Sequence, residues 1–191
     1  MSGRCAIFID GGYMEKILKD LGEPQIDYNK MVESLSIGHD LLRVYYYNCL
    51  PYQPNAPTAE DSRRFANKQR FFQFLNSNDY MTVREGKLEK RGTDADGRGI
   101  FVQKRVDVYL ATDLVMLSTK RTITDAIMFA GDSDFIPAIE VAKAEGVIVQ
   151  LLSVKLTPTP IKARPHNELV QCVDKHRILE QDELLAWQRL E

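Results

Sequence analysis

Two aspartates that follow an apolar run are the residues best placed to do chemistry in this chain. Residues 126–130 are apolar throughout, which predicts a short buried strand, and Asp132 and Asp134 come directly after it. Gly131 lets the chain leave the strand in a tight turn. In an open α/β sheet, ligands bind where the carboxyl ends of the strands meet the amino ends of the helices. Two carboxylates gathered there need neutralising, and a divalent cation can do this.

Two further aspartates have similar positions in the sequence. Asp10 ends the apolar run 5–9, so it lies at the end of a second predicted strand. If the two strands are neighbours, their carboxyl ends meet at a switch point of the sheet. Asp107 lies in the first turn of a predicted helix, 104–120. It precedes the apolar residues on the same side of that helix, which pack on the sheet. Asp113 lies about 120° around that helix from Asp107, so the two do not ligate one ion directly.

Such a group of carboxylates suits magnesium or manganese, which prefer carboxylate oxygens and keep several waters. One or two ions held this way can activate a water and stabilise charge on a phosphodiester during in-line displacement. Basic side chains nearby would hold the phosphates. The candidates for substrate contact are Lys104, Ser133, Lys90 and Arg91.

Purely structural roles remain open for each of these residues. Asp132 or Asp134 can cap the following helix, although capping explains one of them and not both. Asp107 can serve the dipole of its helix. Asp113 is more typical of a local salt bridge, and the basic segment 90–99 reads equally well as a solvated loop.

The elements that must position these residues alternate along the chain. The apolar strands 5–9, 126–130 and 147–152 alternate with amphipathic helices, which predicts βαβ units, a mostly parallel sheet and a three-layer α/β/α fold. Four further features complete the prediction: a strand over 41–48, a strand over 80–88 that turns back at 85–87, a polar loop over 90–99, and a helix in the last dozen residues, about 180–191.

Length and composition narrow the class of protein. A chain of 191 residues suits a single domain, and its net charge of −2 gives no overall basic field of the kind typical of nucleic-acid binders. The three cysteines have no paired spacing, which is typical of a reducing compartment. The sequence holds no run of membrane-spanning length. We therefore expect a cytoplasmic protein that makes no contact with a membrane.

Three segments, taken in order, resemble a known family. They are Ala6–Tyr13, Lys104–Leu114 and Gly131–Pro137, and they resemble the NYN domain family, in particular its LabA-like branch, which belongs to the PIN-like nucleases. The resemblance spans about residues 4 to 179. It implies a three-layer α/β/α fold and a metal-dependent ribonuclease site. It also implies homodimers, because such domains often pair.

The resemblance also implies roles for individual residues. Asp10, Asp107, Asp132 and Asp134 would be the catalytic ligands of Mg²⁺ or Mn²⁺. Asp113 matches a further acidic position, and Lys104 matches the basic residue ahead of the helix. The chain departs from the family at Tyr13, because many members have asparagine three residues after the first aspartate.

Three functions follow from these observations. The first is a Mg²⁺- or Mn²⁺-dependent endoribonuclease acting on single-stranded RNA. The second is a non-catalytic regulatory module of the same fold that binds RNA or a protein partner. The third, a haloacid dehalogenase-like phosphatase, is disfavoured because its motif needs a second aspartate where this chain has Gly12.

Overall fold

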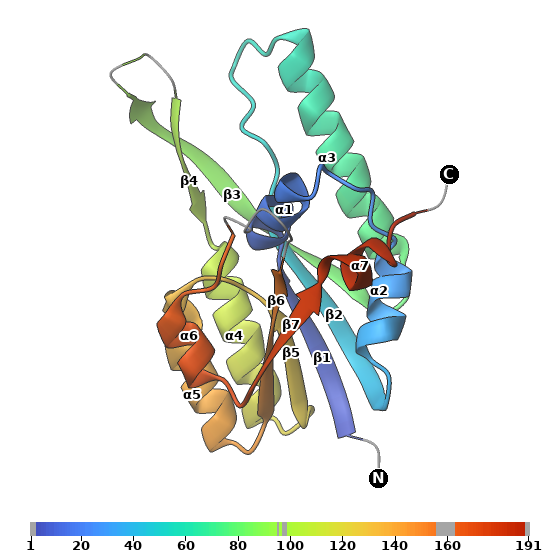
Figure 1. Ribbon diagram of the computed structural model, residues 1–191. Helices are drawn as coiled ribbons and strands as arrows, with labels where there is room; N and C mark the ends of the chain where they lie inside the picture. Colours follow the sequence, from blue (N-terminus) through green and yellow to red (C-terminus); the bar gives the residue numbers. More distant parts are fainter. Residues whose placement is uncertain (1–2, 95, 97–98, 156–162, 190–191) are drawn as a thin grey trace.

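A seven-stranded sheet forms the centre of the protein (Figure 1). The computed structural model describes residues 3–94, 96, 99–155 and 163–189. The strands lie in the order β4-β3-β2-β1-β5-β6-β7. Their bounds are β1 Gly3–Asp10, β2 His39–Cys49, β3 Met81–Thr93, β4 Gly99–Lys104, β5 Asp125–Phe129, β6 Ile148–Lys155 and β7 Lys175–Glu180.

The direction of the strands sets the position of the candidate site. All neighbouring pairs are parallel except β3 and β4, which form an antiparallel hairpin. The chain runs from β1 outward through β2 and β3, and later places β5 on the other side of β1. The strand order therefore switches between β1 and β5, which is where a sheet of this kind offers a ligand site.

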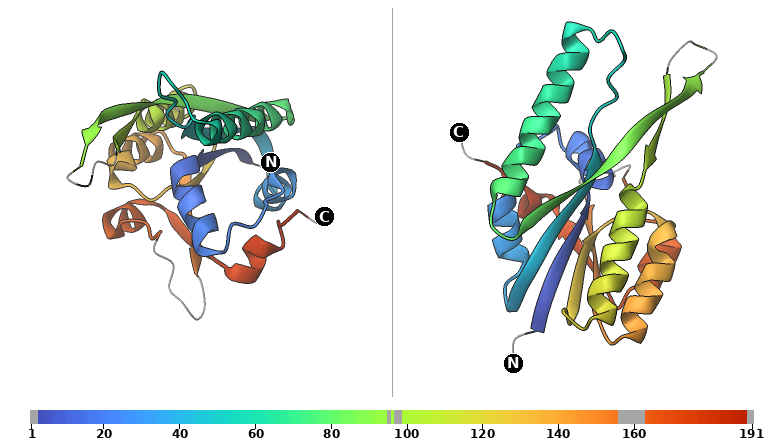
Figure 2. Two further views of the ribbon diagram at one scale, coloured as in Figure 1. Left: turned by 90° about the horizontal axis from the view of Figure 1, so that it is seen from above. Right: turned by 180° about the vertical axis from the view of Figure 1, so that it is seen from behind.

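Helices cover both faces of this sheet, as Figure 2 shows. One face carries α1 Gly11–Asp20, α2 Tyr28–Leu35, α3 Ala59–Ser77 and α7 Gln181–Leu185. The other carries α4 Val106–Thr119, the 3₁₀ turn η1 Ser133–Phe135, α5 Ile136–Ala144 and α6 Asn167–Cys172. Each face has its own apolar core, because successive side chains of a strand point to opposite faces. In β1, Ile7 and Ile9 enter the first core, whereas Ala6 and Phe8 enter the second. The predicted α/β fold is thus confirmed.

The hairpin formed by β3 and β4 corrects two predictions. The chain does not turn back at 85–87, and residues 90–93 belong to a strand rather than to a polar loop. Gly86 continues β3 past two close neighbours. A Cβ there would lie 2.5 Å from Cγ2 of Val106 and 2.6 Å from the carbonyl oxygen of Lys104. This glycine thus permits a close approach of the backbone instead of a turn.

Two helix boundaries also differ from the prediction. The helix α4 begins at Val106, so Lys104 is the last residue of β4. The helix predicted over about 180–191 is also shorter than expected. The observed helix, α7, has only five residues, and Gln188 beyond it forms an isolated β-bridge with Ile26. No helix in the described ranges is long and apolar enough to cross a membrane.

Candidate metal centre

The carboxyl of Asp10 lies at the carboxyl end of the central strand. As the last residue of β1 it caps α1, and its Oδ1 accepts the backbone N–H groups of Gly12 at 2.9 Å and Tyr13 at 3.1 Å. Burial raises its pKa from 3.8 to about 6, against the opposing effect of these two hydrogen bonds. Asp10 forms no salt bridge with any described residue. A half-buried carboxylate of this kind is stabilised by a bound cation.

Asp132 and Asp134 follow the end of β5, the strand that pairs with β1. Asp132 precedes η1, and its Oδ1 accepts the backbone N–H of Asp134 at 3.0 Å, so Asp132 does act as a cap. Both side chains are exposed. Since β5 pairs with β1 up to Phe129 opposite Ile9, the segment 130–134 leaves the same edge of the sheet as Asp10.

Asp107 completes the group from the first turn of α4. Although the residue is exposed, surrounding protein atoms exclude enough water to raise the pKa of its carboxyl, and the charges of Asp132 and Asp134 raise it further. The charge of Asp107 in turn helps to raise the pKa of Asp10. The four predicted ligands therefore share one edge, and the charge of Asp107 acts both on Asp10 and on the pair Asp132/Asp134.

The four carboxylates face a common region but do not close around one point. Within the described ranges, no three acidic, histidine or cysteine side chains form a cluster that could hold a metal ion by themselves. Magnesium usually keeps several waters and binds through one or two carboxylates. The donor set, which is carboxylate oxygen only, and the half-buried charge of Asp10 fit an ion of this partly hydrated kind. They do not fit an ion enclosed entirely by protein ligands.

Asp113 serves another purpose. It is buried, with 5% of its surface exposed, and lies on the same helix as Asp107. Its two oxygens accept Nε of Arg84 at 2.8 Å and Nη2 at 2.9 Å, and Tyr47 donates to it at 3.1 Å. This is the salt bridge that the sequence favoured. Its partner, Arg84 of β3, was missed, since nothing in the sequence pairs two residues 29 positions apart.

The predicted basic contacts do not lie on one surface. Lys90 is opposite Phe101, whereas Lys104 is opposite Lys87 and therefore projects from the other face of the hairpin. Arg91 lies where the strand pairing shifts, and it pairs with Glu89 at 3.8 Å. Ser133, half-buried, begins η1 beside Asp132.

Comparison with known proteins now decides the family. A model of the NYN domain matches residues 4–176, which is nearly the whole chain. The chain belongs to the NYN domain family. This supports a PIN-like nuclease fold, and the family suggests RNA substrates and divalent metals.

A solved structure shows that this NYN domain shares its fold with another protein. A protein of unknown function from Vibrio parahaemolyticus superposes with a TM-score of 0.63 and 16% sequence identity, and the match covers 95% of each chain. At this identity the likeness concerns the fold alone. No curated protein matches the chain.

Tyr13, where many members of the family have asparagine, has a structural role in this NYN domain. Tyr13 is buried, with 5% of its surface exposed, and its hydroxyl has no hydrogen-bond partner among the described residues. Burial, and then the charge of Asp10, raise its pKa. Its ring fills the space beside Gly131, where a Cβ would lie 2.7 Å from Cδ2 of the ring. Tyr13 thus packs the turn after β1 against the turn after β5.

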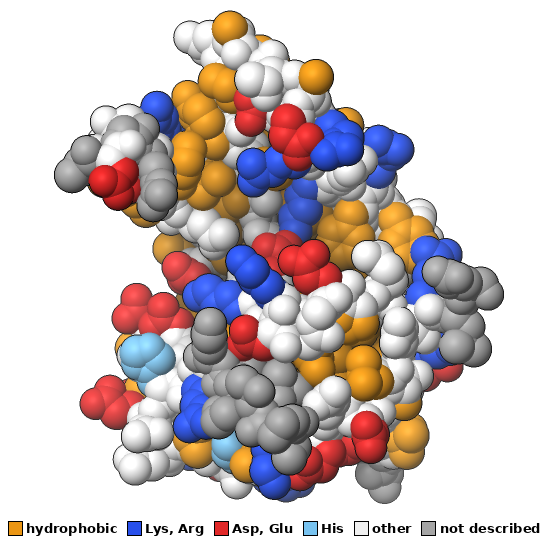
Figure 3. All heavy atoms as spheres, turned by 45° about the horizontal axis from the view of Figure 1, so that its top comes forward, with side chains coloured by type: hydrophobic (Ala, Val, Ile, Leu, Met, Phe, Trp, Pro, Cys, Tyr) orange, Lys and Arg blue, Asp and Glu red, His pale blue; other side chains and the backbone are white. Residues whose placement is uncertain are grey.

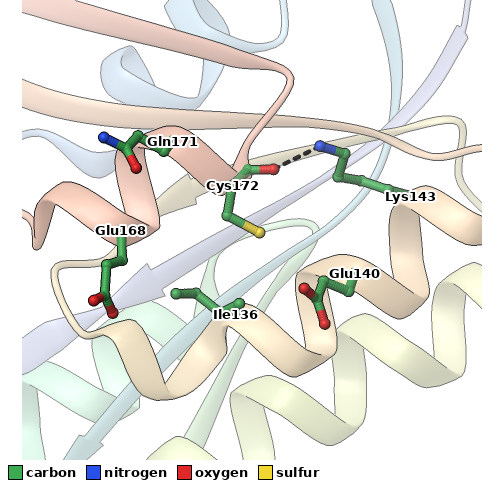
Figure 4. A pocket seen from close by; sticks show the side chains of 6 residues that line it. All are labelled: Ile136, Glu140, Lys143, Glu168, Gln171 and Cys172. Atoms are coloured by element: carbon green, nitrogen blue, oxygen red, sulfur yellow. Dashed lines mark hydrogen bonds between the residues drawn. The ribbon is translucent and has the colours of Figure 1, made fainter.

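A hollow between α5 and α6 of the NYN domain offers a poor anion site (Figure 4). It measures about 510 Å³ and is lined by Glu140, Glu168 and Lys143, among others. The Lys143 ammonium donates to the carbonyl of Cys172 at 2.6 Å and lies 3.4 Å from Asp174. Because the ammonium of Lys143 already has these partners, the negative charges of Glu140 and Glu168 are left in the hollow and repel a phosphate.

Proposed function

We propose that this NYN domain, of the LabA-like branch, is a Mg²⁺- or Mn²⁺-dependent ribonuclease that hydrolyses phosphodiester bonds in RNA. The observation that carries the proposal is the meeting of Asp10, Asp107 and the pair Asp132/Asp134 at the switch point between β1 and β5. These residues come from three separate segments, and helix capping accounts only for Asp10 and Asp132. It leaves Asp107 and Asp134 unexplained.

The position of each aspartate determines how it would bind the metal ion. Asp10, half-buried and fixed by two backbone N–H groups, would hold the ion directly. The exposed Asp107, Asp132 and Asp134 would hold it directly or through its waters. A bound ion at this edge would supply an activated water and stabilise the charge that develops on the phosphate. Ser133 lies next to the acidic pair, where its hydroxyl can contact a phosphate.

The test is cleavage of a labelled single-stranded RNA in Mg²⁺, in Mn²⁺ and in EDTA. Wild-type protein is expected to cleave only with metal, and Asp10→Asn is expected to lose cleavage while staying folded. Asp40→Asn is a matched control, because Asp40 is an exposed carboxylate near the opposite end of the sheet, paired with Arg4. Cleavage that persists in EDTA, or in Asp10→Asn, contradicts the proposal.

A second function, RNA binding without catalysis, is favoured by two observations. The carboxylates of the described residues do not close into a metal cluster, and Tyr13 occupies the position, three residues after Asp10, where many members have asparagine. This reading predicts that the protein binds RNA and leaves it intact in either metal. A cytoplasmic location and a homodimer stay predictions, with size measurement in solution as the test of the second.

A further inference from the structure

A groove runs between α3 and the β3–β4 hairpin, beside the acidic edge. Both elements project beyond the carboxyl ends of the strands (Figures 1 and 2). The groove measures about 500 Å³, within the range of pockets that take a small ligand, roughly 300–1,000 Å³. Its walls come from α3 and the hairpin, and its floor from α1 and the end of β2. Figure 3 shows hydrophobic and basic side chains gathered on this part of the surface.

One end of the groove lies close to Asp10. Gln103 of β4 lines it, and the Gln103 amide lies 3.9 Å from where a Cβ of Gly12 would be. The same Cβ position lies 3.3 Å from Oδ1 of Asp10. Gly12 therefore lies between Gln103, at the end of the groove, and the candidate metal ligand Asp10.

Beyond the residues that line the groove, the same face of the hairpin carries an aromatic and a basic side chain. Leu88 is opposite Gln103, and Lys90 is opposite Phe101, so all four project from one face of the hairpin. The ring of Phe101 lies 5.2 Å from that of Tyr52, which follows β2, and 45% of its surface is exposed. Lys90 forms no salt bridge within the described ranges. An exposed ring beside an unpaired ammonium is typical of nucleic-acid contact.

The helix on the other side contributes positive charge. Lys68 of α3 pairs with Glu15 on the floor of the groove, and Glu15 also accepts Nδ2 of Asn48 at 2.9 Å. The acidic charge of the floor is thereby neutralised. Arg64, one turn earlier on α3, lines the groove and forms no salt bridge with a described residue. Arg64 in the groove and Lys90 beyond its end on the hairpin thus add positive charge next to an acidic edge.

We propose that this groove binds a single strand of RNA and leads it to Asp10. One base stacks on the Tyr52–Phe101 pair, and Arg64 and Lys90 contact phosphates on either side. Stacking on a ring needs a base whose faces are free, which a duplex does not offer. The inference rests on the proposed ribonuclease function and adds to it the surface that would hold the RNA strand.

The test measures binding separately from cleavage. Fluorescence anisotropy with a labelled unpaired RNA oligonucleotide, in EDTA, reports affinity while metal-dependent cleavage is blocked. Phe101→Ala is expected to weaken binding about fivefold or more, and Phe101→Tyr to restore it. Phe74→Ala is the matched control, since Phe74 has a similar exposure, 41%, but lies further along α3 and contacts Arg189. It is expected to bind as wild type does.

The charged residues are tested through the salt dependence of binding. Arg64→Ala and Lys90→Ala are each expected to lower the slope of log affinity against log salt by about 0.7. Arg63→Ala is the control, because this neighbour of Arg64 on α3 already pairs with Glu60. A duplex of the same sequence is expected to bind more weakly than the single strand.

The outcomes separate the two proposals. If the protein cleaves RNA with metal but Phe101→Ala, Arg64→Ala and Lys90→Ala bind and cleave as wild type, the groove proposal is overturned and the ribonuclease stands. Equal affinity for duplex and single strand overturns it too. If wild-type protein binds RNA through the groove but never cleaves it, the groove proposal holds and the ribonuclease fails. If it neither binds nor cleaves RNA, both fail.

Discussion

The ring of Tyr13 lies against the backbone of Gly131, so closely that a Cβ there would come within 2.7 Å of the ring. Tyr13 follows the Asp10 cap, and Gly131 precedes Asp132. One packing contact therefore sets the separation of the two halves of the acidic edge. The sequence pointed to each half, but not to the contact that joins them.

Gly131→Ala is expected to lower the free energy of unfolding by about 1–3 kcal/mol, since the buried ring cannot move aside freely. The loss is measured by urea denaturation. Tyr13→Leu in the same chain removes the ring, so the double variant is expected to lose less than the sum of the two single losses. Strict additivity would show that the two residues do not interact.

Tyr13→Phe is expected to leave stability unchanged or to raise it by about 1 kcal/mol. The phenol oxygen is buried and has no partner among the described residues, so its removal relieves a desolvation cost. Thermal unfolding of the two proteins gives the comparison. A clear loss of stability in Tyr13→Phe would mean that the hydroxyl does have a partner, such as an ordered water.

Asp10→Asn is expected to stabilise the metal-free protein at neutral pH by about 1–3 kcal/mol. The pKa of Asp10 is raised from 3.8 to about 6 on folding, so the carboxyl contributes stability at low pH and that contribution is lost as pH rises through about 6. Asparagine keeps the cap without the charge. Unfolding in EDTA is measured from pH 4 to pH 8, and the gap between the proteins should shrink toward pH 4. A gap that does not change with pH would show that the buried charge of Asp10 is not what destabilises the wild-type protein.

Asp113→Asn is expected to destabilise the protein by about 1–3 kcal/mol, because it breaks a mostly buried pair with Arg84. Asp40→Asn removes an exposed carboxylate that pairs with Arg4 and should cost about 0.5 kcal/mol or less. Denaturant unfolding compares the two variants. Equal losses would show that burial does not strengthen the Arg84–Asp113 pair.

The sequence predicted the inner part of the fold well, for a physical reason. Strands buried on both faces read as short apolar runs, which located β1, β5 and β6. Asp27 and Thr58 cap α2 and α3 through hydrogen bonds to neighbouring backbone N–H groups, so these helix starts also depend on local residues. In these elements, the local signal and the final structure agree because both depend on the same neighbouring residues.

The hairpin could not be predicted in the same way. Gly86 has the appearance of a turn residue, but its role is to let β3 pass Val106 and Lys104, which are distant in the sequence. The salt bridge from Arg84 to Asp113 likewise depends on how α4 packs on the sheet. How closely the carboxylates approach one another was equally hidden, because it depends on the Tyr13–Gly131 contact.

The most direct test of the central claim is the affinity for Mn²⁺, measured by titration calorimetry on wild-type protein and single variants. If the acidic edge is a metal site, wild type binds Mn²⁺, and Asp10→Asn and Asp132→Asn each lose at least about tenfold in affinity. Asp113→Asn and Asp40→Asn should bind as wild type does, since their carboxylates pair with arginines elsewhere. Absence of Mn²⁺ binding, or unchanged affinity in Asp10→Asn, would contradict the account.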